Sequence, residues 1–219
     1  MASRVPELLP LPDRGGRGAL VVLEGIDGSG TTTQCAALAR ALGARGHATH
    51  VTREPSVGPI GTLVRASLGP SGPDLTAGAR ALLFAADRLH HVAQEIAPAL
   101  GRGANVLCDR YLLSSWAYQS LDCDLAWVRQ INALAPWPDL TILLRVPAEI
   151  ALERVRARAR ATGAPTERYD DAATQRALAE RYDTLAAEGL PNLAVVDGAR
   201  APDQVTEALL ALIDPILAG

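Results

Sequence analysis

A glycine-rich segment near the N-terminus contains the residue types of a phosphate-binding loop. Residues 21–34 read VVLEGIDGSGTTTQ. In the usual pattern, GxxxxGK followed by Ser or Thr, loop N–H groups cradle the phosphates, the lysine contacts the outer phosphates, and the hydroxyl binds Mg²⁺. Gly25 and Gly30 hold the two glycine positions, and Thr32 holds the hydroxyl position. The segment therefore predicts nucleotide binding.

The lysine of this pattern is missing. Thr31 stands in its place, and the chain holds no lysine that could replace it, since all 21 of its basic residues are arginine. A hydrogen bond between a charged group and phosphate contributes about 1.5–3 kcal/mol. Its loss in the transition state would cost about 10- to 150-fold in rate. The loop thus leaves open whether phosphoryl transfer is retained.

The residues on either side of the loop match the elements that a phosphate-binding loop needs. Residues 19–23 are a continuous apolar run, typical of a buried parallel strand. Residues 32–42 are rich in Ala and Leu, and a helix starting there would point unpaired N–H groups and its positive dipole end at an anion. The alternative is a structural turn, because glycine-rich turns join strands to helices in many folds.

Strand and helix patterns alternate along the rest of the chain. We expect strands near residues 19–24, 48–52, 104–108, 139–145 and 193–196. We expect helices at residues 31–45, 59–68, 75–101, 112–120, 124–135, 147–161, 171–188 and 202–217. This alternation predicts an α/β fold, a five-stranded parallel sheet with helices on both faces, in one domain of residues 19–219. Active residues should then gather at the carboxyl ends of the strands.

Composition restricts the class of protein. A net charge of −3 argues against a large nucleic-acid-binding surface. The three cysteines lack metal-ligand spacing and suggest reduced thiols in the cytoplasm. No apolar run reaches the length of a membrane span. Residues 1–18 contain Pro, Gly and charges without an apolar core, so we expect a flexible leader and no signal peptide.

Polar motifs follow the predicted strands. The second strand runs into TREP at residues 52–55, and the third ends in DRY at residues 109–111. The helix between them carries LFAADR at residues 83–88. After the fourth strand comes a run of arginines, Arg154, Arg156, Arg158 and Arg160, with Arg168 in ERYD further on. Guanidinium groups bind phosphate through two hydrogen bonds and keep their charge, so they suit phosphoryl transfer.

The motifs EGIDGSG, TREP, LFAADR, DRYLLSSWAYQ and ERYD occur in this order in bacterial thymidylate kinases, and residues 19–213 resemble that family of P-loop nucleoside monophosphate kinases. The resemblance implies Mg²⁺- and ATP-dependent phosphorylation of dTMP to dTDP by a cytoplasmic protein. It also implies a helical lid over ATP at about residues 153–170. Family members are usually homodimers, so a dimer is expected by analogy, with neither nucleic acid nor membrane as a partner.

The resemblance also assigns roles within the acceptor site. Asp27 would contact the dTMP sugar, Arg53 and Arg110 would hold its phosphate, and Glu54 would orient Arg53 or magnesium-bound water. The base and sugar would be contacted by Phe84, Arg88, Ser115, Tyr118, Gln119 and Tyr169. Structural alternatives remain for several of these residues: Phe84 and Tyr118 as ordinary core residues, and Asp109-Arg110 as a strand-end turn with a surface ion pair.

On the donor side, the resemblance assigns ATP binding to the loop and to two arginines, that is, to Gly25, Gly28, Ser29, Gly30, Thr31, Thr32, Thr33, Arg154 and Arg200. Thr32 and Asp109 would support Mg²⁺. Arg200 would lie along the adenine, with Arg40 and Arg45 as alternatives.

The catalytic arginine of this family lies either in the loop or in the lid. Because Gly28 occupies the loop position, the chain resembles the lid type, with Arg158 and Arg160 as the first candidates and Arg154 behind them. Asp27 and Arg110 complete the expected catalytic set. Gly163 and Pro165 would let the lid turn. A solvated basic face is the alternative for the arginine run.

Two departures from the family pattern bear on function. The first is Thr31, for which a lid arginine would compensate. The second is Ser56-Val57-Gly58, where the family commonly has two glycines and a threonine near the acceptor phosphate. Three hypotheses follow: a dTMP kinase, a kinase for another pyrimidine nucleotide, and a catalytically impaired nucleotide-binding protein.

Overall fold

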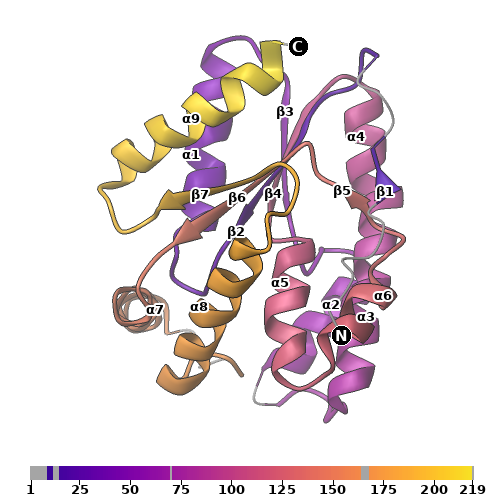
Figure 1. The fold of residues 1–219 in the computed structure, drawn as a ribbon, viewed down its shortest axis with the longest axis vertical. Helices are drawn as coiled ribbons and strands as arrows, with labels where there is room; N and C mark the ends of the chain where they lie inside the picture. Colours follow the sequence, from indigo (N-terminus) through magenta and orange to yellow (C-terminus); the bar gives the residue numbers. More distant parts are fainter. Residues whose placement is uncertain (1–8, 12–14, 70, 164–167, 219) are drawn as a thin grey trace.

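The computed structural model describes residues 9–11, 15–69, 71–163 and 168–218. Its main sheet has five parallel strands in the order β3-β4-β2-β6-β7 (Figure 1). They span β2 Leu20–Glu24, β3 Thr49–Arg53, β4 Asn105–Asp109, β6 Leu140–Arg145 and β7 Leu193–Asp197. All five expected strands are therefore present, with boundaries within one residue of those predicted, and the predicted α/β class is confirmed.

Helices cover both faces of this sheet, as the alternating pattern predicts (Figure 1). On one face lie α1 (Thr31–Ala44) and α9 (Pro202–Ala218). The remaining α-helices are α2 Pro59–Leu68, α3 Ala77–His91, α4 Ala97–Gly101, α5 Leu112–Tyr118, α6 Leu125–Ile131, α7 Ala148–Thr162 and α8 Ala172–Ala187. Among the described residues, no helix is long and apolar enough to span a membrane.

Strand β2 shows why the sheet is buried on both faces. Its neighbours are β4 and β6, so it lies at the centre of the sheet. Val21 and Leu23 join the apolar cluster under α1 and α9, whereas Leu20 and Val22 join the cluster on the opposite face. Successive side chains of a strand point to opposite faces, so an apolar residue is needed at every position. The glycine-rich loop follows this central strand and therefore lies at the carboxyl edge of the sheet.

The predicted helix at 75–101 is interrupted. After α3 the chain forms a π-helical turn, η1 (Val92–Ile96), in which the Ala97 N–H bonds to the Val92 carbonyl, before α4 begins. Pro98 explains the change, since proline has no N–H and its ring collides with the carbonyl four residues earlier. A π-turn shifts the helical register of the residues before it relative to that of the residues after it, and the sequence pattern did not indicate this shift.

Three further differences concern shorter elements. Helix α6 ends at Ile131 and not at 135, because residues 132–135 form turns that lead into the short strand β5 (Pro136–Trp137). The predicted helix at 112–120 is α5 followed by a 3₁₀ turn, η2 (Gln119–Leu121). Strand β5 pairs in parallel with β1 (Leu9–Pro10) in a second, two-stranded sheet that we did not predict.

The expected leader and lid are only partly described. Within residues 1–18, Leu9–Pro10 pair with β5, and Arg17 forms an ion pair with Asp139 at 2.7 Å. Residues 1–8 and 12–14 lie outside the described residues, so a flexible leader stays a prediction. Within the predicted lid, α7 ends at Thr162, and the C-cap residue Gly163 has a left-handed conformation, as expected for a turn. Pro165 lies outside the described residues.

Candidate active site

The glycine-rich loop joins β2 to α1 in the conformation that an anion site requires. Gly25, Gly28 and Gly30 all have positive φ, of 157°, 88° and 100°. Gly30 is the N-cap of α1, and among the described residues no side chain caps this helix and none in its first turn is acidic. The first-turn N–H groups of α1 thus remain available to phosphate, with the positive end of the helix dipole behind them.

Helix α7, which contains most of the predicted lid, packs directly on this loop. A Cβ atom added to Gly28 would lie 2.2 Å from the carbonyl oxygen of Ala151 in α7. No side chain fits at position 28 with α7 in this place, so a loop arginine is excluded sterically. That the catalytic arginines come from the lid stays a prediction.

The threonines at the start of α1 have different surroundings. Thr31, at the lysine position, is buried, whereas Thr32 is exposed. The Thr32 hydroxyl donates a hydrogen bond to Oδ2 of Asp109, at the carboxyl end of β4. The other oxygen, Oδ1, is buried and has no partner among the described residues. Threonine hydroxyl and carboxylate are suitable ligands for Mg²⁺, which usually takes only one or two protein ligands beside phosphate and water.

Among the described residues, no group of three or more His, Cys, Asp or Glu side chains could hold a metal ion. Thr32 and Asp109 alone do not make a closed metal site. They fit a magnesium ion that arrives with a nucleotide, because the phosphates and water then complete its coordination shell.

Arg110 lies at the centre of the site. It is a non-glycine residue in the left-handed region, with φ of 72°. Its guanidinium donates to Asp27 Oδ1 at 2.7 Å, to the Gly25 carbonyl at 2.8 Å and to the Tyr118 hydroxyl at 3.1 Å. Tyr118 in turn donates to Asp27 Oδ2 at 2.9 Å. Three residues predicted to contact dTMP, namely Asp27, Arg110 and Tyr118, are thus already joined to one another and to the phosphate loop.

The electrostatics of Arg110 suit an anion. Burial opposes the charge of the guanidinium, but the nearby Tyr118 and Asp27 raise the pKa of Arg110 well above its ordinary value. For Tyr118, burial is the largest influence and raises the pKa of its hydroxyl well above the usual range. Arg110 therefore keeps its positive charge beside a neutral phenol.

Glu54 differs from expectation. We predicted that it orients Arg53 or magnesium-bound water, but its carboxylate is buried and accepts a hydrogen bond from Arg88 Nη2 at 2.6 Å. Arg53 is exposed at the end of β3, where it pairs in register with Asp109. The correction has a simple reason: successive residues point in opposite directions at a strand end, so Glu54 turns inward and Arg53 outward.

Arg88 is almost fully enclosed. Its Nη1 donates to Ser115 Oγ at 3.0 Å and to Asn132 Oδ1, while Nη2 donates to Glu54 and to the Tyr111 carbonyl at 2.7 Å. Only Nε lacks a partner among the described residues. An arginine has five N–H donors, so this arrangement leaves one donor for a ligand.

A pocket collects the acceptor-site residues that the sequence predicted. Its lining includes Asp27, Glu54, Phe84, Arg88, Arg110, Ser115, Tyr118, Gln119 and Tyr169. Of the predicted acceptor residues, only Arg53 is missing from this lining. Tyr169, near the end of the predicted lid segment, packs edge-on against Tyr118 with ring centroids 5.2 Å apart. Gln119 contributes a buried Oε1 without a partner among the described residues. Three buried polar atoms of the lining residues thus lack a partner among the described residues: the donor Arg88 Nε, the acceptor Gln119 Oε1 and the hydroxyl of Tyr111.

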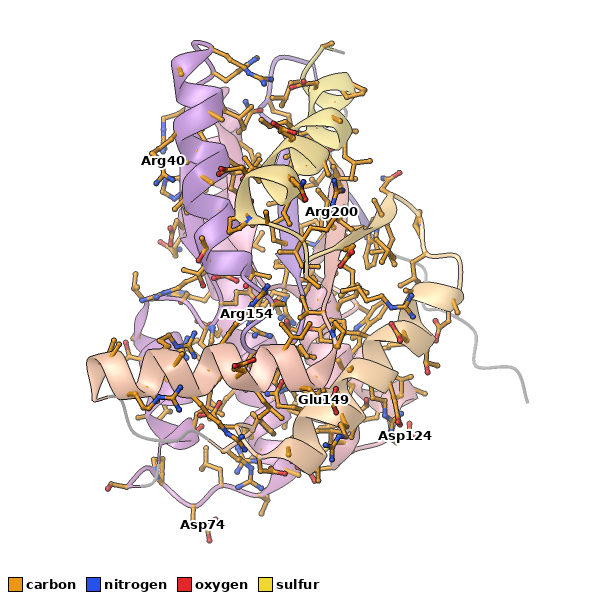
Figure 2. The ribbon with its side chains drawn as sticks, turned by 90° about the vertical axis from the view of Figure 1, so that its left-hand side faces the viewer. Arg40, Asp74, Asp124, Glu149, Arg154 and Arg200 are labelled. Carbon is orange, nitrogen blue, oxygen red and sulfur yellow. The ribbon has the colours of Figure 1, made fainter. Side chains whose placement is uncertain are left out.

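A second pocket lies on the other side of the loop. It is lined by Ser29, Gly30, Thr33, Gln34, Arg154, Gly198, Arg200, Pro202 and Val205. Arg154 Nη1 donates to the carbonyl of Gly198 at 3.1 Å and to that of Gly28 at 3.4 Å. Figure 2 shows Arg154 between α7 and the N-terminal end of α1, with Arg200 near the start of α9. These two arginines lie where ATP-binding residues were expected.

The structure distinguishes Arg154 from the other lid arginines. Arg158 and Arg160 are exposed further along α7, and neither is among the residues that line these two pockets. Of the alternatives for adenine, Arg45 follows the C-terminal end of α1 and pairs with Asp214, and Arg40 is exposed on its outer face (Figure 2). At 1.5 Å per residue, α1 places both well away from the loop at its N-terminus.

Comparison with known proteins identifies the family. Residues 23–209 match the family model described as thymidylate kinase. The chain belongs to the thymidylate kinase family. It is therefore a nucleoside monophosphate kinase by family, in agreement with the nucleotide binding that the sequence predicted.

Individual relatives cover nearly the whole chain. A probable thymidylate kinase of Pyrococcus horikoshii is 39% identical over 208 residues, which are 93% of this chain and 99% of that protein. The thymidylate kinase of Thermomicrobium roseum is 40% identical over 204 residues, 90% of this chain and 95% of that protein. A probable thymidylate kinase of Pyrobaculum calidifontis is also 40% identical over 204 residues, 91% of this chain and 97% of that protein.

Sequence reasoning missed one buried carboxylate of this thymidylate kinase family member. Glu24, the last residue of β2, accepts hydrogen bonds from the Tyr111 N–H at 2.9 Å, from the Ser114 hydroxyl at 2.5 Å and from the Tyr182 hydroxyl at 3.2 Å. It therefore ties the phosphate-loop strand to the start of α5 and to α8. Burial, the largest influence, raises the pKa of Glu24. The sequence did contain a signal for this residue, because Glu24 is a charged residue at the end of an apolar strand.

Proposed function

We propose that this chain transfers the γ-phosphoryl group of ATP to dTMP and forms dTDP. The two pockets on either side of one phosphate loop support this proposal, since phosphoryl transfer needs donor and acceptor phosphates to be held in line. The loop and Arg154 would bind the ATP phosphates in one pocket. Asp27 and Arg110 would hold the acceptor in the other. Names of the relatives point to the same reaction.

The unpaired polar atoms of the acceptor pocket support thymine as the base. Thymine carries a carbonyl oxygen, O4, beside an N–H at N3. Arg88 Nε–H and Gln119 Oε1 are a buried donor and a buried acceptor in one pocket, each without a partner among the described residues. Pairing with O4 and N3–H would satisfy both, whereas cytosine has an amino group and an unprotonated nitrogen at these positions. Leaving such groups unpaired costs about 1–3 kcal/mol each.

The remaining acceptor residues complete the proposal. Phe84 and Tyr169 would pack on the base and sugar, because aromatic rings bind a planar base by stacking. Tyr118 would contact the deoxyribose. Arg53 is exposed at the rim and would reach the acceptor phosphate from β3. Ser115 would act through Arg88, to which its hydroxyl is bonded.

Arg154 supplies the positive charge that Thr31 lacks. It is the lid arginine whose guanidinium contacts the loop in the structure, through the Gly28 carbonyl. Arg158 and Arg160 would act only after the lid closes, since both are exposed. Arg200 would lie against the adenine. This division follows the lid type of bacterial enzymes, in agreement with the steric exclusion of a side chain at Gly28.

Magnesium would bind between the nucleotide phosphates and the chain. Thr32 would contribute its hydroxyl, and Asp109 would contribute its unpaired Oδ1 directly or through water. When bound, the ion neutralises charge that develops on the phosphates. Asp109→Asn should raise the Mg²⁺ concentration for half-maximal activity at least about tenfold, since a charged partner is lost. An unchanged magnesium requirement would exclude Asp109 from this role.

The cytoplasmic location and the homodimer belong to the same proposal. Leu63 on α2 and Leu82 on α3 are apolar side chains about half exposed, at 45% and 51%, on two helices that pack together. Such side chains would be covered in a dimer. Light scattering on the purified protein would measure its mass, and a monomer at micromolar concentration would exclude a stable dimer.

The experiment that tests the function is ADP release with Mg·ATP and a panel of dTMP, dUMP, dCMP, dGMP and thymidine. We expect turnover with dTMP and much less with dCMP. Because uracil has the same donor and acceptor edge as thymine, dUMP is the second candidate acceptor. Absence of turnover with every acceptor, together with measurable dTMP binding, would mean that the chain binds nucleotides for another purpose.

A further inference from the structure

Glu54, which lines the acceptor pocket, is hydrogen-bonded to two buried side chains of α3, Arg88 and His91. Glu54 Oε2 accepts from Arg88 Nη2 at 2.6 Å, and Glu54 Oε1 lies 3.3 Å from His91 Nδ1. His91 is completely buried, one helical turn after Arg88 on α3. The Glu54 carboxylate is therefore shared between an arginine and a histidine, one oxygen to each.

The second ring nitrogen of His91, Nε2, also has partners. Its Nε2 lies 2.8 Å from Thr52 Oγ1 and 3.4 Å from Glu95 Oε2. Glu95 belongs to the π-helical turn η1, and its other oxygen contacts His50 Nε2 at 2.9 Å. Both ring nitrogens of His91 thus have partners, which prevents the ring from turning away from Glu54.

A carboxylate beside an arginine ordinarily takes two parallel N–H donors, because the fork of the guanidinium matches its two oxygens. For Glu54 the second donor would be Arg88 Nε, the N–H adjacent to Nη2. That N–H has no partner among the described residues, although it is buried. His91 holds the Glu54 oxygen that would otherwise bind it.

We infer that His91 is a positioning residue for acceptor recognition, which holds Glu54 in a one-oxygen contact and thereby keeps Arg88 Nε–H available to the acceptor base. This inference rests on the proposed function, in which that N–H meets O4 of thymine. The residues that line the pocket do not include His91, so it acts only through Glu54.

The test compares His91→Phe, which keeps a ring and removes both nitrogens, with His91→Gln, which restores a donor. In His91→Phe, Glu54 is expected to accept a second hydrogen bond, from Arg88 Nε–H. The KM for dTMP should rise about tenfold and the preference for dTMP over dCMP should fall about tenfold, as for a lost hydrogen bond to a charged group. The KM for ATP and kcat at saturating dTMP should stay within about twofold. His91→Gln should recover most of the dTMP affinity.

A double-mutant cycle shows whether His91 acts through Glu54. In a Glu54→Gln background, His91→Phe should change the KM for dTMP by less than about twofold, because residues that act as one unit are not additive. His90→Phe is the matched control, since His90 precedes His91 on α3 and is half-buried outside this network. It should leave both KM values unchanged.

Failure of the proposed function and failure of this inference are distinguished by measuring equilibrium binding of dTMP by calorimetry, together with turnover. If the wild-type protein neither binds nor phosphorylates dTMP, the proposed function falls and this inference falls with it. If the wild type binds dTMP and His91→Phe binds it equally well, the inference alone is overturned. Additive losses in the cycle, or a parallel fall in kcat, ATP affinity and melting temperature, would assign His91 a purely structural role and also overturn it.

Discussion

Arg154 and Gly28 are 126 residues apart in the chain and meet at the phosphate loop, where Arg154 Nη1 donates to the Gly28 carbonyl at 3.4 Å. The glycine allows α7 to approach, and the approach brings the arginine to the loop. A positive charge is thereby supplied from the lid helix to a loop whose lysine position holds a buried threonine.

Replacing Arg154 should therefore weaken ATP use more than replacing the arginines further along α7. We expect Arg154→Gln to raise the KM for ATP about 10- to 150-fold, the range for a lost charged hydrogen bond to phosphate. Arg158→Gln and Arg160→Gln should mainly lower kcat, because these exposed side chains reach ATP only in a closed lid. Steady-state kinetics with varied ATP would decide. Equal KM values in all three variants would remove the special role of Arg154.

Thr31→Lys should restore part of the missing contact with the outer phosphates. We expect kcat to rise about tenfold or more, since the lysine adds a charged hydrogen bond in the transition state. Arg154→Gln should then cost less in the Thr31→Lys background than in the wild type, because either cation would serve the phosphates. If Thr31→Lys leaves turnover unchanged or lower, the loop has become adapted to threonine.

Gly28→Ala and Gly30→Ala form a matched pair for the packing of α7. Both glycines have positive φ, so alanine adds backbone strain of about 1–2 kcal/mol at either position. Only at Gly28 does the added Cβ also meet a backbone atom, the Ala151 carbonyl oxygen at 2.2 Å, while none lies within 4 Å at Gly30. Urea unfolding should show Gly28→Ala to be less stable than Gly30→Ala by about a further 1–3 kcal/mol. Equal stabilities would contradict the close packing of α7 on the loop.

The buried Glu24 predicts a particular dependence of stability on pH. Burial raises its pKa in the folded protein, with hydrogen bonds from Ser114 and the charge of Arg110 partly offsetting it. The folded state therefore binds this proton more tightly than the unfolded chain, whose pKa is about 4.3. The stabilisation is fully present below about pH 4 and is lost as pH rises through the raised pKa.

Glu24→Gln removes this titration and keeps a similar shape. We expect the free energy of unfolding of wild type, relative to that of Glu24→Gln, to decrease between about pH 4 and pH 7. Denaturant unfolding of both proteins across this range would measure it. A difference that increases with pH would mean that the hydrogen bonds donated to the Glu24 carboxylate stabilise it by more than its burial costs.

Much of the fold was predictable because it depends on local patterns. The apolar runs place the five strands, and the punctuation by glycine and proline places most helices. Parallel order then brings TREP, DRY and the glycine-rich loop to one edge. Pro98 was visible in the sequence, yet its effect, a π-turn that orients Glu95 toward His91, depends on how the helix packs.

The sequence by itself determined the loop, its missing lysine and the residue types that line the acceptor pocket, since these follow from identity and spacing along the chain. Only the tertiary structure decided that Glu54 faces Arg88 and not Arg53, and that Arg154 is the lid arginine at the loop. The physical reason is that these contacts depend on the rotation of strand ends and of α7 about their own axes. That rotation is set by packing between segments remote in the chain, and no short sequence pattern encodes it.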